Sequence, residues 1–133
     1  MKKFLILLLL SLASVMSFSQ TTLWFRTTEF AYKSRNDYGR WTGWSDWEES
    51  DMNVKFDLSK DLIIIYSPDI QVYNVLEEKE PPYDQTGRQV KYWVINQNKE
   101  YGYLRLRIQD NGTSQIYVDF TDYCLVYNVI RIR

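Results

Sequence analysis

The sequence contains 133 residues, of which 45% are hydrophobic, 17% are aromatic and 25% are charged, and its formal net charge is −1. It contains no histidine and a single cysteine. These counts exclude imidazole zinc sites, Ser-His-Asp or Cys-His catalysis, and an internal disulfide. The balanced charge argues against nucleic acid as the main partner, and the composition is too apolar for a disordered chain. We therefore predict one folded domain that holds neither a metal ion nor a cofactor.

The N-terminus follows the pattern of a secretory signal peptide. Two lysines precede an unbroken apolar run over residues 4–10, and Ser17 and Ser19 place small side chains at the −3 and −1 positions of a cut before Gln20. The alternative is a membrane anchor, but a span needs about 20 apolar residues and serines interrupt this stretch too early. We therefore predict that residues 1–19 are a signal peptide and are removed.

Cleavage there would leave residues 20–133, which we predict to form a single all-β domain in the periplasm or outside the cell. This chain has 14 basic and 17 acidic residues, a net charge of −3, and no stable membrane span. Its one cysteine, Cys124, lies in an apolar stretch, so we expect a buried free thiol. Stability must then come from the core, which a domain of this size can supply.

Apolar and polar residues alternate with a period of two from residue 23 onward, which is typical of half-buried strands. Turn residues separate eight such runs, and the last splits near Thr121, giving eight or nine strands. The runs are 23–33, 40–48, 53–58, 62–67, 70–76, 90–97, 103–109 and 115–133. Antiparallel strands of this number close a core as a small barrel or a two-sheet sandwich. The short connections favour the barrel.

One strand register follows from the residues themselves. A three-residue loop at 110–112 places apolar residues opposite apolar ones and polar residues opposite polar ones, whereas a one-residue slip would mix the two faces. The paired residues are Leu106 with Ile116, Leu104 with Val118, Arg107 with Gln115 and Arg105 with Tyr117. By contrast, the acidic stretch 77–88 contains paired prolines, which cannot donate to a sheet, so we expect a loop there.

Three tryptophans with a spacing of three residues, Trp41, Trp44 and Trp47, are the leading candidate binding site, with Tyr38 and Arg40 beside them. In a strand, Trp41 and Trp47 would share one face and Trp44 would take the other, unless Gly43 marks a bulge that re-aims the chain. An exposed indole combines a large apolar area with one N–H donor, which suits a protein partner or a cell-surface glycan. The alternative is that all three tryptophans pack in the core or close a barrel end.

The tryptophan spacing resembles the ladder of thrombospondin type 1 repeats, but those repeats depend on several disulfides that this chain cannot form. A second resemblance is carried by residues 17–20, 26–30, 39–48, 65–67, 71–73 and 115–118. In these segments the chain resembles uncharacterised small exported β-rich proteins of Bacteroidetes-type bacteria and their phages. That resemblance implies export and a β-rich fold, and it implies no activity.

We therefore predict a non-enzymatic exported binding module with an aromatic surface. One alternative is a small-ligand carrier, because eight strands leave room for one small ligand inside a barrel. Its cavity would lie among Trp24, Phe30, Phe56, Tyr66, Trp93 and Phe120. A less favoured alternative is a glycoside hydrolase that uses two carboxylates from Asp46, Glu48, Glu49 and Asp51.

A basic set near the C-terminus contains Arg105, Arg107, Arg131 and Arg133. Basic and aromatic residues on one sheet are typical of single-strand nucleic-acid platforms. Export and the net negative charge argue against that function. We expect instead that these arginines pair across strands with Asp119 or with tyrosine rings.

Overall fold

The computed structural model of the chain describes residues 22–79, 87–109 and 113–132. The predicted signal peptide at 1–19 and the predicted three-residue loop at 110–112 lie outside these residues. The fold is all-β, and a single 3₁₀ turn, Leu58–Lys60, connects two strands. The strands are β1 Thr22–Ser34, β2 Glu48–Glu49, β3 Asn53–Asp57, β4 Leu62–Ile65, β5 Gln71–Lys79, β6 Gly87–Ile95, β7 Tyr101–Gln109, β8 Ser114–Asp119 and β9 Tyr123–Arg131.

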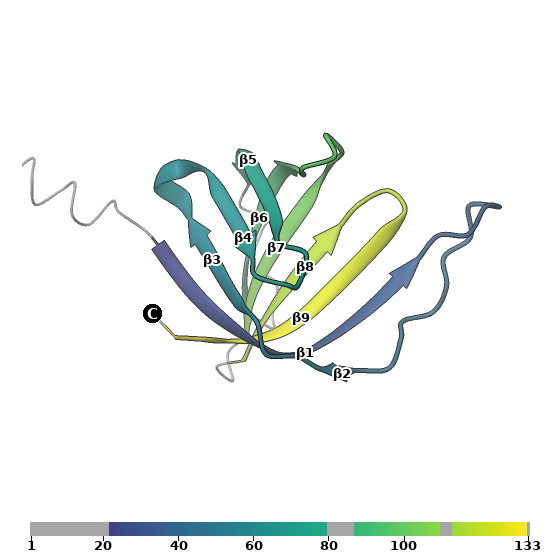
Figure 1. Cartoon of the computed structure of the whole chain (residues 1–133), viewed down its shortest axis with the longest axis horizontal. Coiled ribbons are helices and arrows are strands. Elements are labelled where there is room, and N and C mark those ends of the chain that lie inside the picture. The colour runs from purple at the N-terminus through teal and green to yellow at the C-terminus, as the bar shows by residue number, and fades with distance from the viewer. Residues whose placement is uncertain (1–21, 80–86, 110–112, 133) are drawn as a thin grey trace, which may run out of the picture.

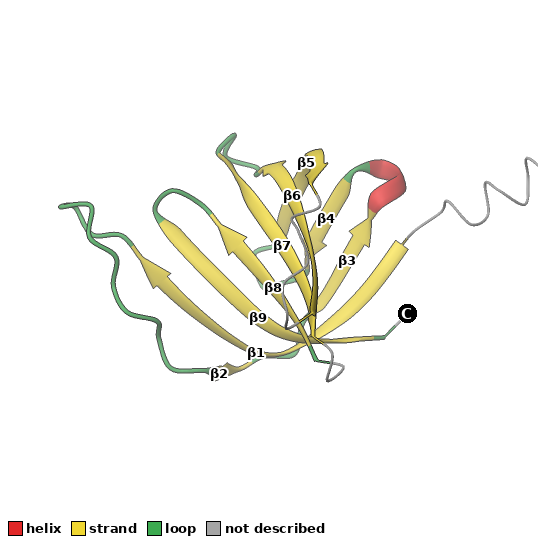
Figure 2. Ribbon diagram, turned by 180° about the vertical axis from the view of Figure 1, so that it is seen from behind, coloured by secondary structure: helices red, strands yellow, loops and turns green. Residues whose placement is uncertain are grey.

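Eight of the nine strands form a closed antiparallel barrel, which confirms the predicted fold. The order is β1-β3-β4-β5-β6-β7-β8-β9, with β9 pairing back onto β1, and β2 is an extra short strand on β1. The long strands β1 and β9 run side by side and close the barrel (Figures 1 and 2). No helix in the described part of the chain is long and apolar enough to cross a membrane.

The barrel interior is filled by the alternate residues that the period-two pattern placed on one face. Phe56 is fully buried, and its ring centroid lies 5.5 Å from that of Phe25 and 5.8 Å from that of Tyr92, both in T-shaped contacts. Such contacts add to the stability gained from burying aromatic area. The aliphatic core around these rings consists of Val54, Ile63, Ile65, Val94, Leu104, Leu106, Ile116, Val118 and Val129.

The register predicted between β7 and β8 is confirmed at all four pairs, including Leu106 with Ile116 and Arg105 with Tyr117. The last run also divides as predicted, because residues 120–122 separate β8 from β9. Cys124 is a buried free cysteine, and burial raises the pKa of its thiol. The thiol therefore stays protonated at neutral pH.

Two strand irregularities change which residues face the core. In β1 the register against β9 shifts at Thr28, so the residues after it reverse their sides. In β5 a shift at Leu76 lets pairing with β6 continue through Glu78 and Lys79. The predicted loop at 77–88 was therefore too long, because β5 extends to Lys79 and β6 begins at Gly87. The paired prolines of that stretch lie outside the described residues.

Candidate functional site

The tryptophan segment is not the strand that alternation predicted. Within 40–49 only Glu48–Glu49 forms a strand, and the rest is an extended segment with one isolated bridge between Trp41 and Arg35. The segment runs antiparallel along the edge of β1 and bonds to it at every third residue. The contacts are Thr42 N to Ser34 O at 2.8 Å, Ser45 N to Tyr32 O at 2.8 Å, and the pairing of Glu48 with Phe30.

Two hydroxyl side chains complete this docking. The Ser34 amide donates to Thr42 Oγ1 at 3.0 Å, and the Tyr32 amide donates to Ser45 Oγ at 2.9 Å. Each hydroxyl residue therefore uses both its main-chain N–H and its side-chain oxygen on one residue of β1. These bonds satisfy edge groups that a free strand would leave unpaired.

The register matches three residues of the segment to two residues of β1, so all three indoles lie on the outer side of the barrel. Lys33 contacts both Trp41 and Trp44, and Trp44 and Trp47 line the same hollow. The expectation that Trp44 takes the face opposite to Trp41 and Trp47 was wrong, because it assumed a period-two ladder. The exposed fractions of Trp41, Trp44 and Trp47 are 41%, 46% and 46%.

Two cationic side chains interleave with these rings, Lys33 of β1 and Arg35 just after the end of β1. The Lys33 ammonium lies 5.3 Å from the Trp41 ring centroid and 4.7 Å from that of Trp44, and the Arg35 guanidinium lies 5.7 Å from Trp41. All three distances are within the range of cation–π attraction. We call this arrangement of Arg35, Trp41, Lys33, Trp44 and Trp47 the tryptophan ladder.

Between Trp44 and Trp47 the ladder contains a hollow of about 230 Å³ instead of a cation. Its floor is a cross-strand row on the outer face, formed by Ala31 of β1, Val126 of β9 and Tyr117 of β8. Ala31 is 2% exposed and Val126 is 4% exposed, so the floor is apolar and covered. An aromatic-walled slot of this kind suits a flat ring or an organic cation.

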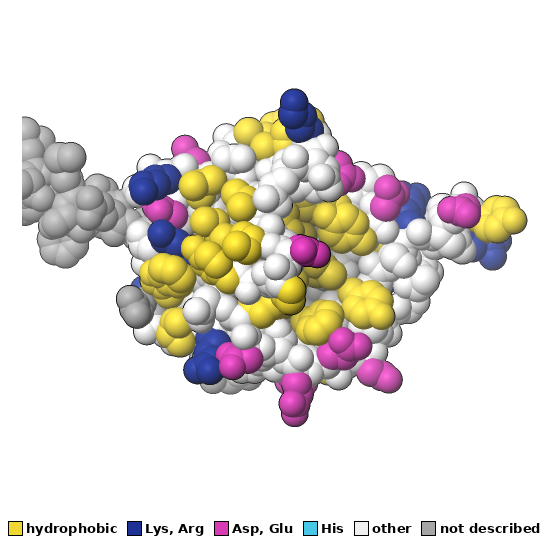
Figure 3. All heavy atoms as spheres, viewed as in Figure 1, with side chains coloured by type: hydrophobic (Ala, Val, Ile, Leu, Met, Phe, Trp, Pro, Cys, Tyr) yellow, Lys and Arg dark blue, Asp and Glu magenta, His cyan; other side chains and the backbone are white. Residues whose placement is uncertain are grey.

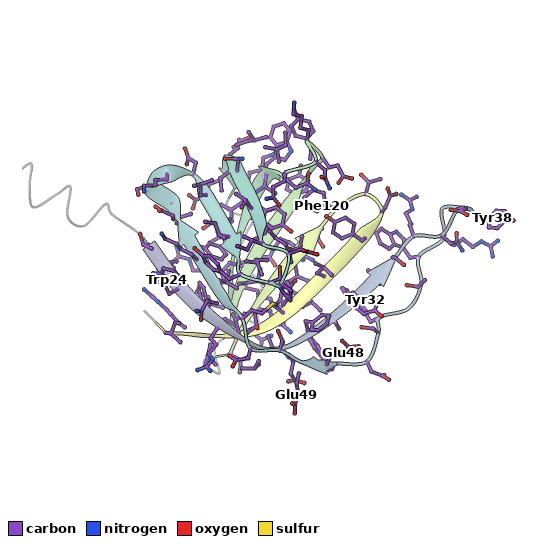
Figure 4. All side chains as sticks on the ribbon, viewed as in Figure 1. Trp24, Tyr32, Tyr38, Glu48, Glu49 and Phe120 are labelled. Atoms are coloured by element: carbon purple, nitrogen blue, oxygen red, sulfur yellow. The ribbon has the colours of Figure 1, made fainter. Side chains whose placement is uncertain are left out.

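The structure does not bring Tyr38 and Arg40 into this hollow. They belong to the turn at 36–40, where Asn36 Oδ1 accepts hydrogen bonds from the Tyr38 amide at 3.0 Å and the Arg40 amide at 2.9 Å. Gly39 supplies the positive φ of 76° that closes the turn. Tyr38 is 90% exposed at the far tip of the molecule (Figure 4). Of the five predicted site residues, the three tryptophans therefore form one site.

The acidic cluster lies on the exposed rim beside β2. Asp46, Glu48 and Glu49 are exposed, and Glu49 points away from the barrel in Figure 4. Asp51 forms an exposed ion pair with Arg26, which holds the pKa of its carboxyl below the usual value. A hydrolase acid needs the opposite shift. Among the described residues, no group of three or more acidic or cysteine side chains is placed to hold a metal ion.

The aromatic residues predicted to line an internal cavity divide between the two sides of the barrel wall. Phe30, Phe56 and Phe120 face the core. On the outside, Trp24 stacks on Tyr66 with ring centroids 6.2 Å apart, and Trp93 makes a tilted contact with Tyr101 at 6.0 Å. The six residues therefore do not enclose one cavity, because strand parity sends alternate side chains outward.

A smaller hollow of about 220 Å³ lies at one barrel mouth, lined in part by Gln71, Tyr73 and Tyr123. The Tyr73 hydroxyl donates to Gln71 Oε1 at 2.6 Å, and Gln71 Nε2 donates to the Tyr127 hydroxyl at 3.4 Å. Burial raises the pKa of both tyrosines, so they remain protonated. Figure 3 shows hydrophobic side chains gathered around the hollowed centre of this face.

The expected arginine pairing is confirmed at Arg105. Its Nε donates to Asp119 Oδ2 at 2.6 Å, and its guanidinium carbon lies 4.2 Å from the Tyr117 ring centroid. The residue therefore joins a cross-strand pair and a cation–π contact on the outer face of β7 and β8. Paired in this way, Arg105 offers less charge to an outside ligand.

Residues outside the tryptophan segment complete the site and were missed from the sequence: Ala31, Lys33, Arg35, Gln115, Tyr117 and Val126. Lys33 and Ala31 alternate with core residues in the first strand, so their outward direction was available from periodicity. Their contact with the tryptophans required the docking of the segment on β1. Comparison with models of known protein families, with curated proteins and with solved structures gave no match.

We predict that replacing Thr42 by valine and Ser45 by alanine loosens the docked segment. Each substitution removes the oxygen that accepts an amide of β1, at a cost of about 1 kcal/mol. The Tyr32 and Ser34 amides should then exchange with solvent roughly fivefold faster, as measured by hydrogen exchange. The Leu104 amide, in the core of β7, is the internal control. Unchanged exchange at both β1 amides would contradict the docking.

Proposed function

We propose that this protein is an exported, non-enzymatic binding module that recognises a protein or a cell-surface glycan through the tryptophan ladder. Export rests on the signal-peptide pattern of residues 1–19. The observation that carries the binding proposal is the presentation of three indoles, each more than two-fifths exposed, on one side of the barrel. Soluble proteins rarely leave such an aromatic cluster in water without a partner.

The ladder is also held ready for binding. Its backbone is hydrogen-bonded to β1 at two places, and Lys33 stacks against two of the three rings. A surface that is ordered before binding loses less conformational entropy when a partner arrives. Tryptophan is enriched among the residues that dominate binding energy at interfaces. Rigid, exposed indoles therefore favour recognition over a purely structural function.

A small-ligand carrier is the second candidate, and the hollow at the barrel mouth favours it. The polar groups of Gln71 and Tyr73 beside apolar Leu125 could orient one small molecule. The hollow has about the same volume as the one in the ladder, but the barrel interior behind it is filled by the core. The carrier therefore has less room than an aromatic-lined barrel cavity would give.

The proposal is tested by measuring binding of residues 20–133 to a panel of purified secreted proteins and surface glycans by surface plasmon resonance. A variant with Trp41, Trp44 and Trp47 replaced by alanine should lose at least tenfold in affinity for any panel member that the wild type binds. The loss should arise from faster dissociation, as is usual for interface truncations.

A matched control removes two tryptophans elsewhere on the barrel exterior. Replacing Trp24 and Trp93 by alanine deletes indoles that contact Tyr66 and Tyr101, away from the ladder. This variant should keep wild-type affinity if its circular dichroism and melting temperature are preserved. Equal binding by the ladder variant and the wild type would contradict the proposed function. Loss of binding only on changing Gln71 to leucine would favour the carrier.

A further inference from the structure

Cations and indoles alternate along the tryptophan ladder. Side chains of β1 and of Arg35, the residue after it, alternate with the indoles, so that Arg35 contacts Trp41 and Lys33 contacts both Trp41 and Trp44. The next outward position toward the N-terminus is Ala31, which stands where a cation would meet both Trp44 and Trp47. Its methyl group leaves the hollow of about 230 Å³ there.

We infer that this hollow is a receptor for a lysine side chain of a partner protein, an inference that rests on the proposed function. The protein itself provides the precedent, because the ammonium of Lys33 occupies the neighbouring position, 5.3 and 4.7 Å from two indole centroids. A partner lysine would take the equivalent position between Trp44 and Trp47. The indole walls of Trp44 and Trp47 and the side chain of Tyr117 line the same hollow and would contact its methylene stem.

The charge near the hollow changes along the ladder, because the Lys33 ammonium lies 4.7 Å from the Trp44 ring centroid at one end and acidic residues follow at the Trp47 end. Asp46 and Glu48 flank Trp47 in the docked segment, and Glu29 is the next outward position of β1 after Ala31. On the other side, Arg105 is already paired with Asp119 at 2.6 Å. Carboxylates at the rim attract a cation, and indole faces give the strongest cation–π contacts among the aromatic side chains.

The experiment titrates residues 20–133 with N-acetyl-lysine methylamide and follows tryptophan fluorescence at constant ionic strength. We expect a saturable change with a dissociation constant of about 1 mM or weaker, which is typical of one small contact. Two probes of similar shape test the charge. The Nε-acetylated derivative and the norleucine derivative both lack the ammonium and should bind at least tenfold more weakly.

Two variants test the location. Ala31→Lys would fill the hollow with the protein's own ammonium and abolish the response, whereas Tyr38→Lys adds the same charge at the distant tip and should leave it unchanged. If Ala31→Lys lowers the melting temperature, Trp47→Leu provides a second test, because it removes one wall from an exposed position. Lys33→Ala should open a second hollow and double the number of lysine derivatives bound.

The inference is overturned if the Nε-acetylated derivative binds as well as the lysine derivative, or if both Ala31→Lys and Trp47→Leu keep the wild-type response. Absence of any response up to 50-fold above the expected dissociation constant, about 50 mM, would also overturn it. A different result would contradict the proposed function: the triple tryptophan variant would bind every panel member with wild-type affinity. A partner that depends on the tryptophans but does not compete with the lysine derivative would overturn the inference alone.

Discussion

Replacing Gly102 by alanine is expected to lower the free energy of unfolding by about 3 kcal/mol, the upper end of the usual cost of overpacking. A Cβ at this position of β7 would lie 2.6 Å from the main-chain oxygen of Asp119 and 2.8 Å from the ring of Phe120. The oxygen belongs to the sheet, and the ring stacks on Tyr123 with centroids 5.3 Å apart. Neither neighbour can retreat without disturbing β8 and β9.

Urea unfolding followed by circular dichroism measures this effect as a shift in midpoint. The control is Gly43→Ala, because a Cβ there meets nothing within 4 Å and the site lies in the docked segment. That variant should stay within about 0.5 kcal/mol of wild type. A cost for Gly102→Ala below that of Gly43→Ala would contradict the close approach of β7 to the Asp119–Phe120 corner.

Truncating Phe56 to alanine is expected to cost about 3–5 kcal/mol, the range for removing a buried aromatic ring. The ring is fully buried and contacts the rings of Phe25 and Tyr92 in T-shaped geometry. Domains of this size have unfolding free energies of about 5–15 kcal/mol, so the loss would remove a large part of the total. Without a disulfide, the core must supply that stability.

Phe56→Leu is the matched control, since it keeps an apolar side chain in the same place and should recover at least half of the loss. Differential scanning calorimetry gives both melting temperatures, and the alanine variant should melt lowest. A melting temperature of Phe56→Ala equal to that of wild type would show that the ring is not at the centre of the core. Such a result would also remove the basis for a filled barrel.

Much of the fold could be predicted because side chains along each strand alternate between the core and the outer face of the barrel. Alternation located eight strands, and the match of apolar residues around 110–112 fixed the register of Leu106 with Ile116. The exact extent of β5 could not be predicted, because the irregularity at Leu76 shifts the alternation and carries pairing through to Lys79. A bulge leaves no distinctive residue in the sequence.

The three tryptophans lie together on the outer side of the barrel, but the backbone that carries them is not the predicted strand. A spacing of three between Trp41, Trp44 and Trp47 is inconsistent with one face of a regular strand, so we predicted a division between two faces unless Gly43 marked a bulge. In the structure the spacing is satisfied by a different backbone, in which Thr42 and Ser45 bond to alternate residues of β1. A hydroxyl residue after each of the first two tryptophans was the available signal.

The hollow over Ala31 could not have been found from sequence. The small side chain of Ala31 leaves the space open, and residues of β8 and β9, 84 or more positions after Ala31, form other parts of its lining. Only the closure of the barrel by β1 and β9 brings Val126 beside Ala31. A site that is built from distant strands in this way can be recognised only when the order of the strands in the sheet is known.

The most direct test of the tryptophan surface is an indole ¹H–¹⁵N spectrum of residues 20–133, recorded during titration with N-acetyl-lysine methylamide. The chain has five tryptophans, so each indole gives one assignable signal. If lysine binds in the hollow, the signals of Trp44 and Trp47 will move together and saturate, while those of Trp24 and Trp93 will stay fixed. Equal movement of Trp24 and Trp44, or no movement of any signal, would contradict this prediction.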